Sequence, residues 1–219
     1  MGDPIGPDQL PQLRIATEGI QKDAIAALAQ LKSEADLRSC IELLNRIDPK
    51  DTGTILMPIL PDLPATLQQR VLEIIVKSPA PDPQHSIVVN QILARSAWPD
   101  LTASALKYIY LTNDHADFGK LKPYLNPSIP PVIRGTAAAL CLEKGNNQLK
   151  GEATNVLRLM LTNNQKYEKL LGAKALTNLK FLQALQLYVP ALLDDSDIDV
   201  KCAAFEVVSA THFEKPIPS

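Results

Sequence analysis

The stretch Ile133-Arg134-Gly135-Thr136-Ala137-Ala138-Ala139-Leu140 decides the fold, because its arrangement of large and small residues recurs on both sides of it. An apolar residue near the start of a helix and a small residue four positions later share one helix face. The pattern predicts the inner helix of a repeat, in which the small residue lets a neighbouring helix approach closely. The sequence thus predicts an architecture, whereas no part of it names a ligand or a reaction.

Five other segments align with this one. The apolar residues that set the register are Leu37, Leu67, Leu101, Ile133, Leu171 and Val200, and the residues four positions later are Ile41, Val71, Ala105, Ala137, Ala175 and Ala204. Successive register residues are separated by 30, 34, 32, 38 and 29 residues, a period near 33. Such a period predicts helical pairs that each bury one face and need a neighbour for the other.

Proline residues mark the same repeat. The chain has 18 prolines and 9 glycines, and proline is tolerated in the first turn of a helix, where its missing N–H costs nothing. Pro64, Pro99 and Pro130-Pro131 stand just before aligned segments, so we expect them to start helices. A second series lies in the intervening helices, in Met57-Pro58-Ile59-Leu60, Lys122-Pro123-Tyr124-Leu125 and Val189-Pro190-Ala191-Leu192. This series argues against a strand over 54–60, because proline cannot serve a central ladder.

Two stretches resemble the HEAT family of helical repeats, in which an Asp-rich turn precedes an inner helix of the form apolar-basic-x-x-Ala. They are 188–204, with Asp194-Asp195-Ser196-Asp197 before Val200-Lys201, and 131–137, with Ile133-Arg134. The spacing is shorter than the 40–47 residues typical of HEAT units, but tetratricopeptide and ankyrin patterns are absent. The resemblance implies an all-α fold, a right-handed α-solenoid of about six stacked HEAT-like hairpins. It would span 9–213, with a linker at 1–8 and a tail at 214–219.

Composition weakens several classes of function. With 22 basic and 24 acidic residues and a net charge of −2, the chain has no global field that would attract nucleic acid. No apolar run is long enough to cross a bilayer. Cys40, Cys141 and Cys202 lack metal-ligand spacing and fall in apolar helical patterns, so we expect small core residues in a reducing cytosolic setting. The three histidines also lack ligand partners. We expect neither a metal, a cofactor nor a catalytic residue.

Polar stripes offer candidate binding residues. The second helices of a helical-pair stack normally line its concave surface, which is the leading location for recognition. Polar residues at helical spacing interrupt apolar runs, and the candidates are Asn90, Gln91, Arg95, Asn155, Arg158, Thr162, Gln183 and Gln186. The alternative is that these side chains are the solvated backs of amphipathic helices.

The resulting functional hypothesis is a noncatalytic interaction or regulatory scaffold, part of a larger protein. It would present its concave surface to a protein partner or to another domain of its parent chain. The block from Ile133 to Leu179 resembles HEAT regions attached to bacterial membrane transporters of the nucleotide-exchange type. This resemblance implies a position in the cytoplasm, either free or at the cytoplasmic side of a membrane. The alternative is a HEAT-like enzyme, such as a chromophore lyase or a DNA glycosylase. The single Trp98 and the slightly acidic balance argue against a DNA enzyme.

Overall fold

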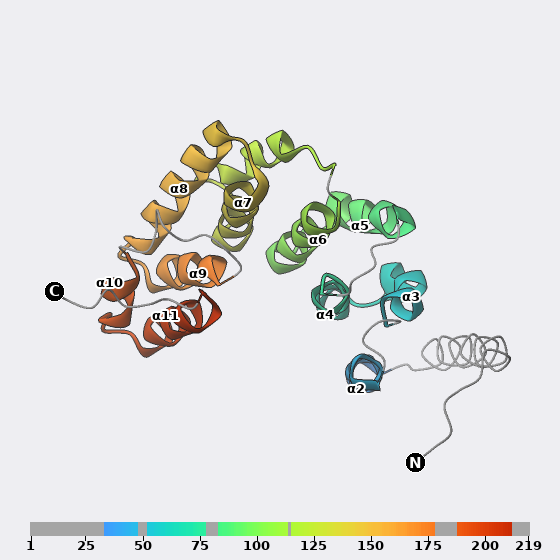
Figure 1. The fold of residues 1–219 in the computed structure, drawn as a ribbon. Coiled ribbons are helices and arrows are strands. Elements are labelled where there is room, and N and C mark those ends of the chain that lie inside the picture. The colour runs from blue at the N-terminus through green and yellow to red at the C-terminus, as the bar shows by residue number, and fades with distance from the viewer. Residues whose placement is uncertain (1–32, 48–51, 78–82, 114, 178–187, 212–219) are drawn as a thin grey trace, which may run out of the picture. The chain divides into compact units, whose positions relative to one another are not determined.

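A computed structural model describes residues 33–47, 52–77, 83–113, 115–177 and 188–211. In this part of the chain the secondary structure is helical throughout, without strands (Figure 1). The chain divides into two compact units, Met1–Arg95 and Ser96–Ser219. The domain boundaries expected at residues 8 and 213 lie outside the described residues. No described helix has the length and apolar character needed to cross a membrane.

The first unit contains five described helical segments. They are α2 (Glu34–Ile47), α3 (Thr52–Leu56), the 3-10 helix η2 (Met57–Asp62), α4 (Ala65–Ile75) and α5 (Pro83–Arg95). α4 packs against α2, α3 and η2, and α5 packs against η2. Arg70 of α4 donates to the carboxylate of Glu42 on α2 through Nε at 2.6 Å and Nη2 at 2.9 Å. This bidentate pair ties the two helices together beside their apolar contact.

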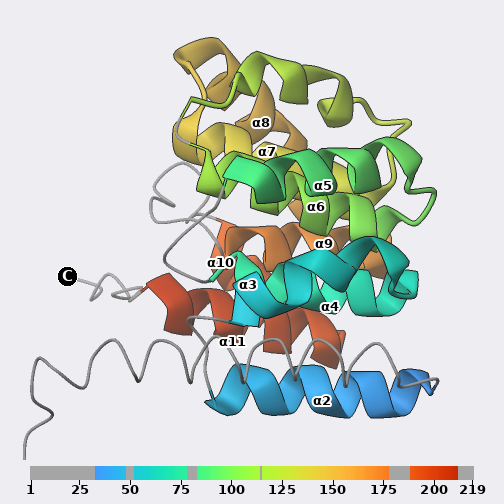
Figure 2. The same ribbon diagram turned by 90° about the vertical axis from the view of Figure 1, so that its right-hand side faces the viewer.

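The second unit contains the segments that build the candidate site. They are α6 (Pro99–Thr112), the 3-10 helix η3 (Phe118–Leu125), α7 (Pro131–Lys144), α8 (Asn147–Leu161), α9 (Lys166–Leu176), α10 (Val189–Leu193) and α11 (Ile198–Thr211). α7 packs against α6, η3, α8 and α9, while α9 also packs against α8 and α11. α7 and α8 lie side by side in both views of the ribbon (Figure 2). Consecutive packing of α6, α7, α9 and α11 therefore runs through this unit.

The predicted register is confirmed by burial. We call α2, α4, α6, α7, α9 and α11 the register helices, because they carry the aligned residues. All six residues at the second aligned position are buried, and so are five of the six register residues themselves. Leu171 is the exception and is only half-buried. The pair of apolar residues four positions apart thus marks the side of each helix that is removed from water.

Helix starts follow the predicted proline positions. Pro64 precedes the first residue of α4, while Pro99 and Pro131 are the first residues of α6 and α7. In each of these three helices the carbonyl of the residue before the helix accepts from a backbone N–H three or four residues later, as Pro130 does from Ile133 and Arg134 at 3.0 Å. Proline therefore occupies positions where an amide donor is not needed.

The second proline series lies in helical segments, but these are shorter or more tightly wound than expected. Pro58 lies in the six-residue η2 and Pro123 in the eight-residue η3, both 3-10 helices, while Pro190 lies in the five-residue α10. Pro123 lies inside η3, where its missing N–H removes the hydrogen bond to residue i−4 and favours i−3 pairing, whereas Pro58 and Pro190 lie in the first turn of η2 and α10, where no donor is needed. The argument against a strand at 54–60 is confirmed, since α3 and η2 cover these residues.

Candidate functional site

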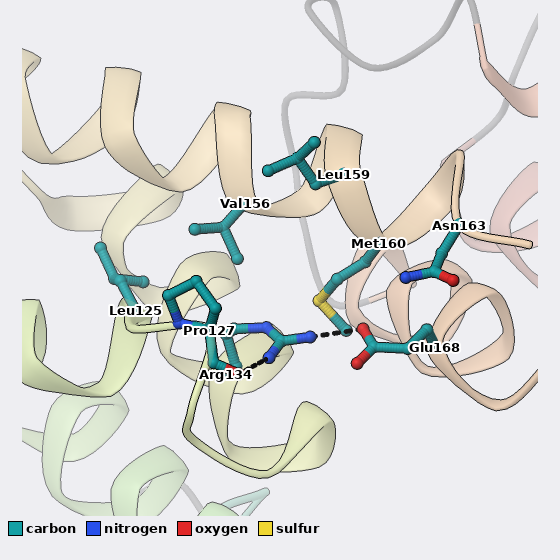
Figure 3. A pocket seen from close by; sticks show the side chains of 8 residues that line it. All are labelled: Leu125, Pro127, Arg134, Val156, Leu159, Met160, Asn163 and Glu168. Atoms are coloured by element: carbon teal, nitrogen blue, oxygen red, sulfur yellow. Dashed lines mark hydrogen bonds and ion pairs between the residues drawn. The ribbon is translucent and has the colours of Figure 1, made fainter. Parts of the chain in front are cut away.

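A cavity of about 350 Å³ lies in the second unit, between α8 and the segments that face it. We call it the α8 pocket (Figure 3). Its lining comes from η3, the η3–α7 loop, α7, α8, the α8–α9 turn and α9, and consists of Leu125, Pro127, Arg134, Val156, Leu159, Met160, Asn163 and Glu168. The volume lies at the lower end of the range for pockets that bind small molecules.

The apolar wall of the pocket is one side of α8. Val156, Leu159 and Met160 are spaced by three and four residues, which places them on neighbouring parts of one helix face. Met160 is 1% exposed, Val156 is half-buried and Leu159 is 51% exposed. The Val156 side chain points from α8 toward Arg134 (Figure 3). The wall therefore passes from a buried floor to an open apolar rim.

Two glycines fix the position of Met160 at the floor. A Cβ atom on Gly172 of α9 would lie 3.0 Å from Met160 Cβ, and one on Gly135 of α7 would lie 3.3 Å from Met160 Cε. Both glycines are buried. Without their side chains α7 and α9 approach α8 more closely than larger residues would allow. The floor of the pocket thus depends on the same contacts that hold the three helices together.

The polar wall is an ion pair between α7 and α9. Arg134 Nη2 donates to the Glu168 carboxylate, and the two side chains are only 10% and 14% exposed. Arg134 Nη1 donates to the carbonyls of Pro127 at 2.8 Å and Ile129 at 3.1 Å. The guanidinium therefore fastens the η3–α7 loop to α9, and its charge is balanced inside the wall. Because the site is poorly hydrated, loss of either side chain would leave the charge of the other uncompensated.

Asn163 lies at the end of the pocket nearest Glu168. Its Oδ1 accepts a hydrogen bond from the Gln165 backbone N–H at 2.8 Å, which fixes the amide. Its Nδ2 has no hydrogen-bond partner among the described residues. The pocket therefore contains one neutral donor held in a defined direction, beside an apolar wall.

Three predicted binding residues lie on the adjacent side of α8. Asn155, Arg158 and Thr162 are exposed, Arg158 Nη2 donates to Asn155 Oδ1 at 2.6 Å, and Thr162 Oγ1 donates to the Arg158 carbonyl at 2.9 Å. Leu159 follows Asn155 by one helical turn, so this stripe borders the pocket rim. In the predicted hairpins α8 would be the first helix of the α8–α9 pair, whereas the concave surface is expected on second helices.

The other predicted residues do not contribute to this pocket. Asn90, Gln91 and Arg95 are exposed on α5, in the first unit, where Asn90 Nδ2 donates to the Ser86 carbonyl at 2.7 Å. Gln183 and Gln186 lie outside the described residues.

Sequence patterns do not identify the pocket, because its residues come from separate segments of the chain, such as Leu125, Arg134 and Glu168. The one local signal is the spacing of Val156, Leu159 and Met160, which a buried helix face would also show.

Reactive side chains do not gather at the pocket. Among the described residues no three of His, Cys, Asp and Glu lie together in a way that could hold a metal ion. Cys141 is buried as expected, and burial raises the pKa of its thiol to about 11, which keeps it protonated. The expectation that Cys202 is a core residue is wrong, because it is exposed on α11. Cys40 is half-buried.

Searches of family models, of curated proteins and of solved structures find no match to this chain. The chemistry of the α8 pocket and the order of helix packing are therefore the basis for a functional conclusion.

Proposed function

We propose that this chain is a noncatalytic interaction module whose α8 pocket binds an uncharged apolar side chain of a protein partner or of another domain in the parent chain. The observation that carries this proposal is the combination of an accessible apolar wall with charged groups that are already paired. The apolar wall favours an apolar occupant, and the paired charges disfavour a charged one.

The apolar wall favours an aliphatic or small aromatic occupant. Leu159 is half-exposed at the rim, and Val156 and Met160 continue the apolar surface inward. Burying a side chain such as leucine contributes about 1.5–3 kcal/mol. This gain is large enough to anchor a partner segment when other contacts contribute beside it.

The paired charges disfavour a charged occupant. Arg134 and Glu168 neutralise one another within the wall, and the Lys122 Nζ to Glu152 Oε1 distance of 2.9 Å marks a second pair between η3 and α8. An entering charge would lose hydration and would find no unpaired opposite charge in return. A neutral group next to the anchor can instead accept a hydrogen bond from Asn163, as a backbone carbonyl does.

The scaffold role is supported by the order of packing. Register helices α6, α7, α9 and α11 contact one another in sequence order, which is the arrangement expected of a right-handed α-solenoid of HEAT-like hairpins. In such a stack each helical pair depends on its neighbours. We propose this architecture for the chain, with recognition by shape rather than by reactive groups.

Methionine methyl NMR tests the pocket directly. The chain has three methionines, of which Met160 lies in the pocket and Met57 is buried in η2 of the other unit. We expect N-acetyl-leucine methylamide at millimolar concentration to shift the ¹³C-methyl signal of Met160 and to leave that of Met57 unchanged. The corresponding lysine and glutamate derivatives should produce smaller shifts.

A matched pair of variants completes the test. Leu159→Asp places a charge at the rim of the pocket. It should reduce the shift of the Met160 methyl signal with N-acetyl-leucine methylamide at least tenfold. Ile87→Asp alters a side chain of similar exposure, 62% against 51%, on α5 and should leave the response intact. An unmoved Met160 signal, or equal shifts with the charged probes, would contradict the proposal.

A further inference from the structure

Helix α11 is the last register helix that the structure describes, and one of its sides is apolar and exposed. Ile198 is 68% exposed, Phe205 is 60% exposed, and Cys202 between them is also exposed. Their spacing of four and three residues places them on one side of the helix. We call these three residues the α11 face. Val200 and Ala204 lie on the buried side of the same helix, with no exposed surface.

The preceding register helices bury the positions that are equivalent to the α11 face. Cys202 follows its register residue by two positions and Phe205 follows it by five. The residues at these two positions are Gly135 and Ala138 in α7, and Ala173 and Leu176 in α9. All four are buried. A single exposed apolar residue needs no explanation, but two positions that change together indicate a surface that another helix covers in the preceding repeats.

In α7 this surface receives the next register helix. A Cβ atom on Gly135 would lie 3.5 Å from Ala175 Cβ and 3.6 Å from the Leu171 carbonyl oxygen, both on α9. Leu171 is the register residue of α9, and Ala175 lies four positions after it. The helix that covers this side of α7 therefore presents an apolar residue and an alanine four positions apart. α11, which packs against α9 in turn, has the same pair in Val200 and Ala204.

Each following helix also brings a carboxylate to a cation of the register helix before it. Glu168 stands three positions before the register residue of α9, and it pairs with Arg134, which directly follows the register residue of α7. Asp197 stands three positions before the register residue of α11, and it pairs with Lys166 of α9 at 2.9 Å. Lys201 of α11 occupies the position that Arg134 has in α7.

Lys201 is available for the same kind of pair. Its side chain is half-buried and makes no ion pair with a carboxylate in the described part of the chain. The pKa of Asp195 is lowered by Lys169 and more weakly by Lys201, but the hydrogen bond to this carboxylate comes from Lys169. A carboxylate placed as Glu168 is in α9 would therefore give Lys201 the partner that Arg134 has.

We infer that the α11 face binds a helix of a partner protein that carries an acidic residue three positions before an apolar residue and an alanine four positions after it. The acidic residue pairs with Lys201, and the alanine lies against Cys202. Ile198 and Phe205 provide apolar area on both sides of this small residue. Because the contact is one helix face, we expect a dissociation constant on the order of 100 µM.

Fluorescence anisotropy with a labelled copy of α9 tests the pairing. The probe is a peptide of the sequence 165–177, which contains Glu168, Leu171 and Ala175 in the required order. A peptide of this length is weakly helical, so a lactam joins Lys166 to an aspartate introduced by Leu170→Asp, one helical turn away. The wild-type chain should bind the probe saturably. A control peptide with Glu168→Lys should bind at least about fivefold more weakly, because it places a like charge beside Lys201.

Variants of the chain separate the apolar contact from the charge pair. Phe205→Asp should weaken binding of the probe at least tenfold, whereas Ile87→Asp alters a similarly exposed residue on α5 and should leave it unchanged. Lys201→Glu should reverse the preference, so that the Glu168→Lys peptide binds more tightly than the probe. Because none of the altered side chains is buried, thermal unfolding should show that these variants fold.

Absence of saturable binding, equal affinity for the two peptides, or binding unaffected by Phe205→Asp would overturn the inference. Self-association of the chain that Phe205→Asp prevents, measured by sedimentation without peptide, would assign the face to a second copy and would also overturn it. The proposed pocket function is tested separately, because Phe205→Asp should preserve the Met160 response and Leu159→Asp should preserve binding of the probe.

Discussion

Adding one methyl group at Gly172 should destabilise the second unit, whereas the same change at Gly151 should stabilise it. Gly172 lies in α9 and Gly151 in α8, so both substitutions place alanine inside a helix. Alanine is favoured over glycine there by about 1 kcal/mol. Because this gain is common to both variants, the difference between their free energies of unfolding reports the packing around each residue.

The space around the two residues differs sharply. A Cβ atom at Gly151 would meet no atom within 4 Å, whereas one at Gly172 would lie 3.0 Å from Met160 Cβ and 3.3 Å from Leu161 Cδ2. Met160 Cβ is attached to the α8 backbone and cannot rotate away, so α9 must shift relative to α8. Overpacking of this kind costs about 1–3 kcal/mol. Gly151→Ala should therefore raise the free energy of unfolding by about 0.5–1 kcal/mol, and Gly172→Ala should lower it by about 1 kcal/mol.

Urea unfolding, monitored by circular dichroism, measures both changes on the same scale. The two variants should differ by about 1–3 kcal/mol, which corresponds to several degrees in melting temperature for a chain of this size. Gly172→Ala should also shift the Met160 methyl signal, since it disturbs the floor of the α8 pocket, while Gly151→Ala should not. If Gly172→Ala is as stable as Gly151→Ala, close approach does not determine the packing of α9 on α8.

Other perturbations test individual contacts of the second unit by urea unfolding. Arg134→Met leaves the Glu168 carboxylate poorly hydrated and unpaired, and should cost about 3–5 kcal/mol; replacing Glu168 by leucine as well should recover part of this loss. Asn146→Ala removes the cap whose side chain accepts from the Leu149 N–H at 2.9 Å, and should cost about 1 kcal/mol. The hydrogen bond from Lys169 holds the pKa of Asp195 below its usual value. The unfolded chain therefore binds a proton first on acidification, so this stabilisation is present above about pH 4 and is lost as pH falls through the lowered pKa. In Lys169→Met the free energy of unfolding should therefore fall less steeply as the pH decreases through this range.

Much of the local structure could be predicted because it depends on neighbours within a few turns. The register positions are buried because an apolar residue and a small residue four positions apart share one helix face, as Ile133 and Ala137 do. The Asp-rich turn precedes a helix, as the resemblance implies, and Asp197 Oδ1 accepts from the N–H groups of Asp199 at 2.9 Å and Val200 at 3.4 Å. These features require no knowledge of tertiary contacts.

The α8 pocket could not be predicted, because its walls meet only after folding. Arg134 and Glu168 are 34 residues apart, and the loop carbonyl of Pro127 completes the site. In the sequence Arg134 is simply the basic residue that follows a register position, a place where a solvated side chain is the ordinary expectation. Burial of the guanidinium follows from the closeness of α9, which in turn follows from Gly135 and Gly172. Local pattern therefore identified the helix but not the role of its charged residue.

The position two residues after the register residue links these observations. It is Gly135 in α7, Ala173 in α9 and Cys202 in α11, a series of small residues of which Gly135 faces Ala175 of the following register helix. A small residue occupies this position in α6, α7, α9 and α11, and Cys202 falls in an apolar helical pattern, so the sequence wrongly predicts that it lies in the core. Whether the position is buried depends on what packs against it, and the pattern within one helix carries no information about that. The same small-residue position is thus buried in α7 and α9 and exposed on α11.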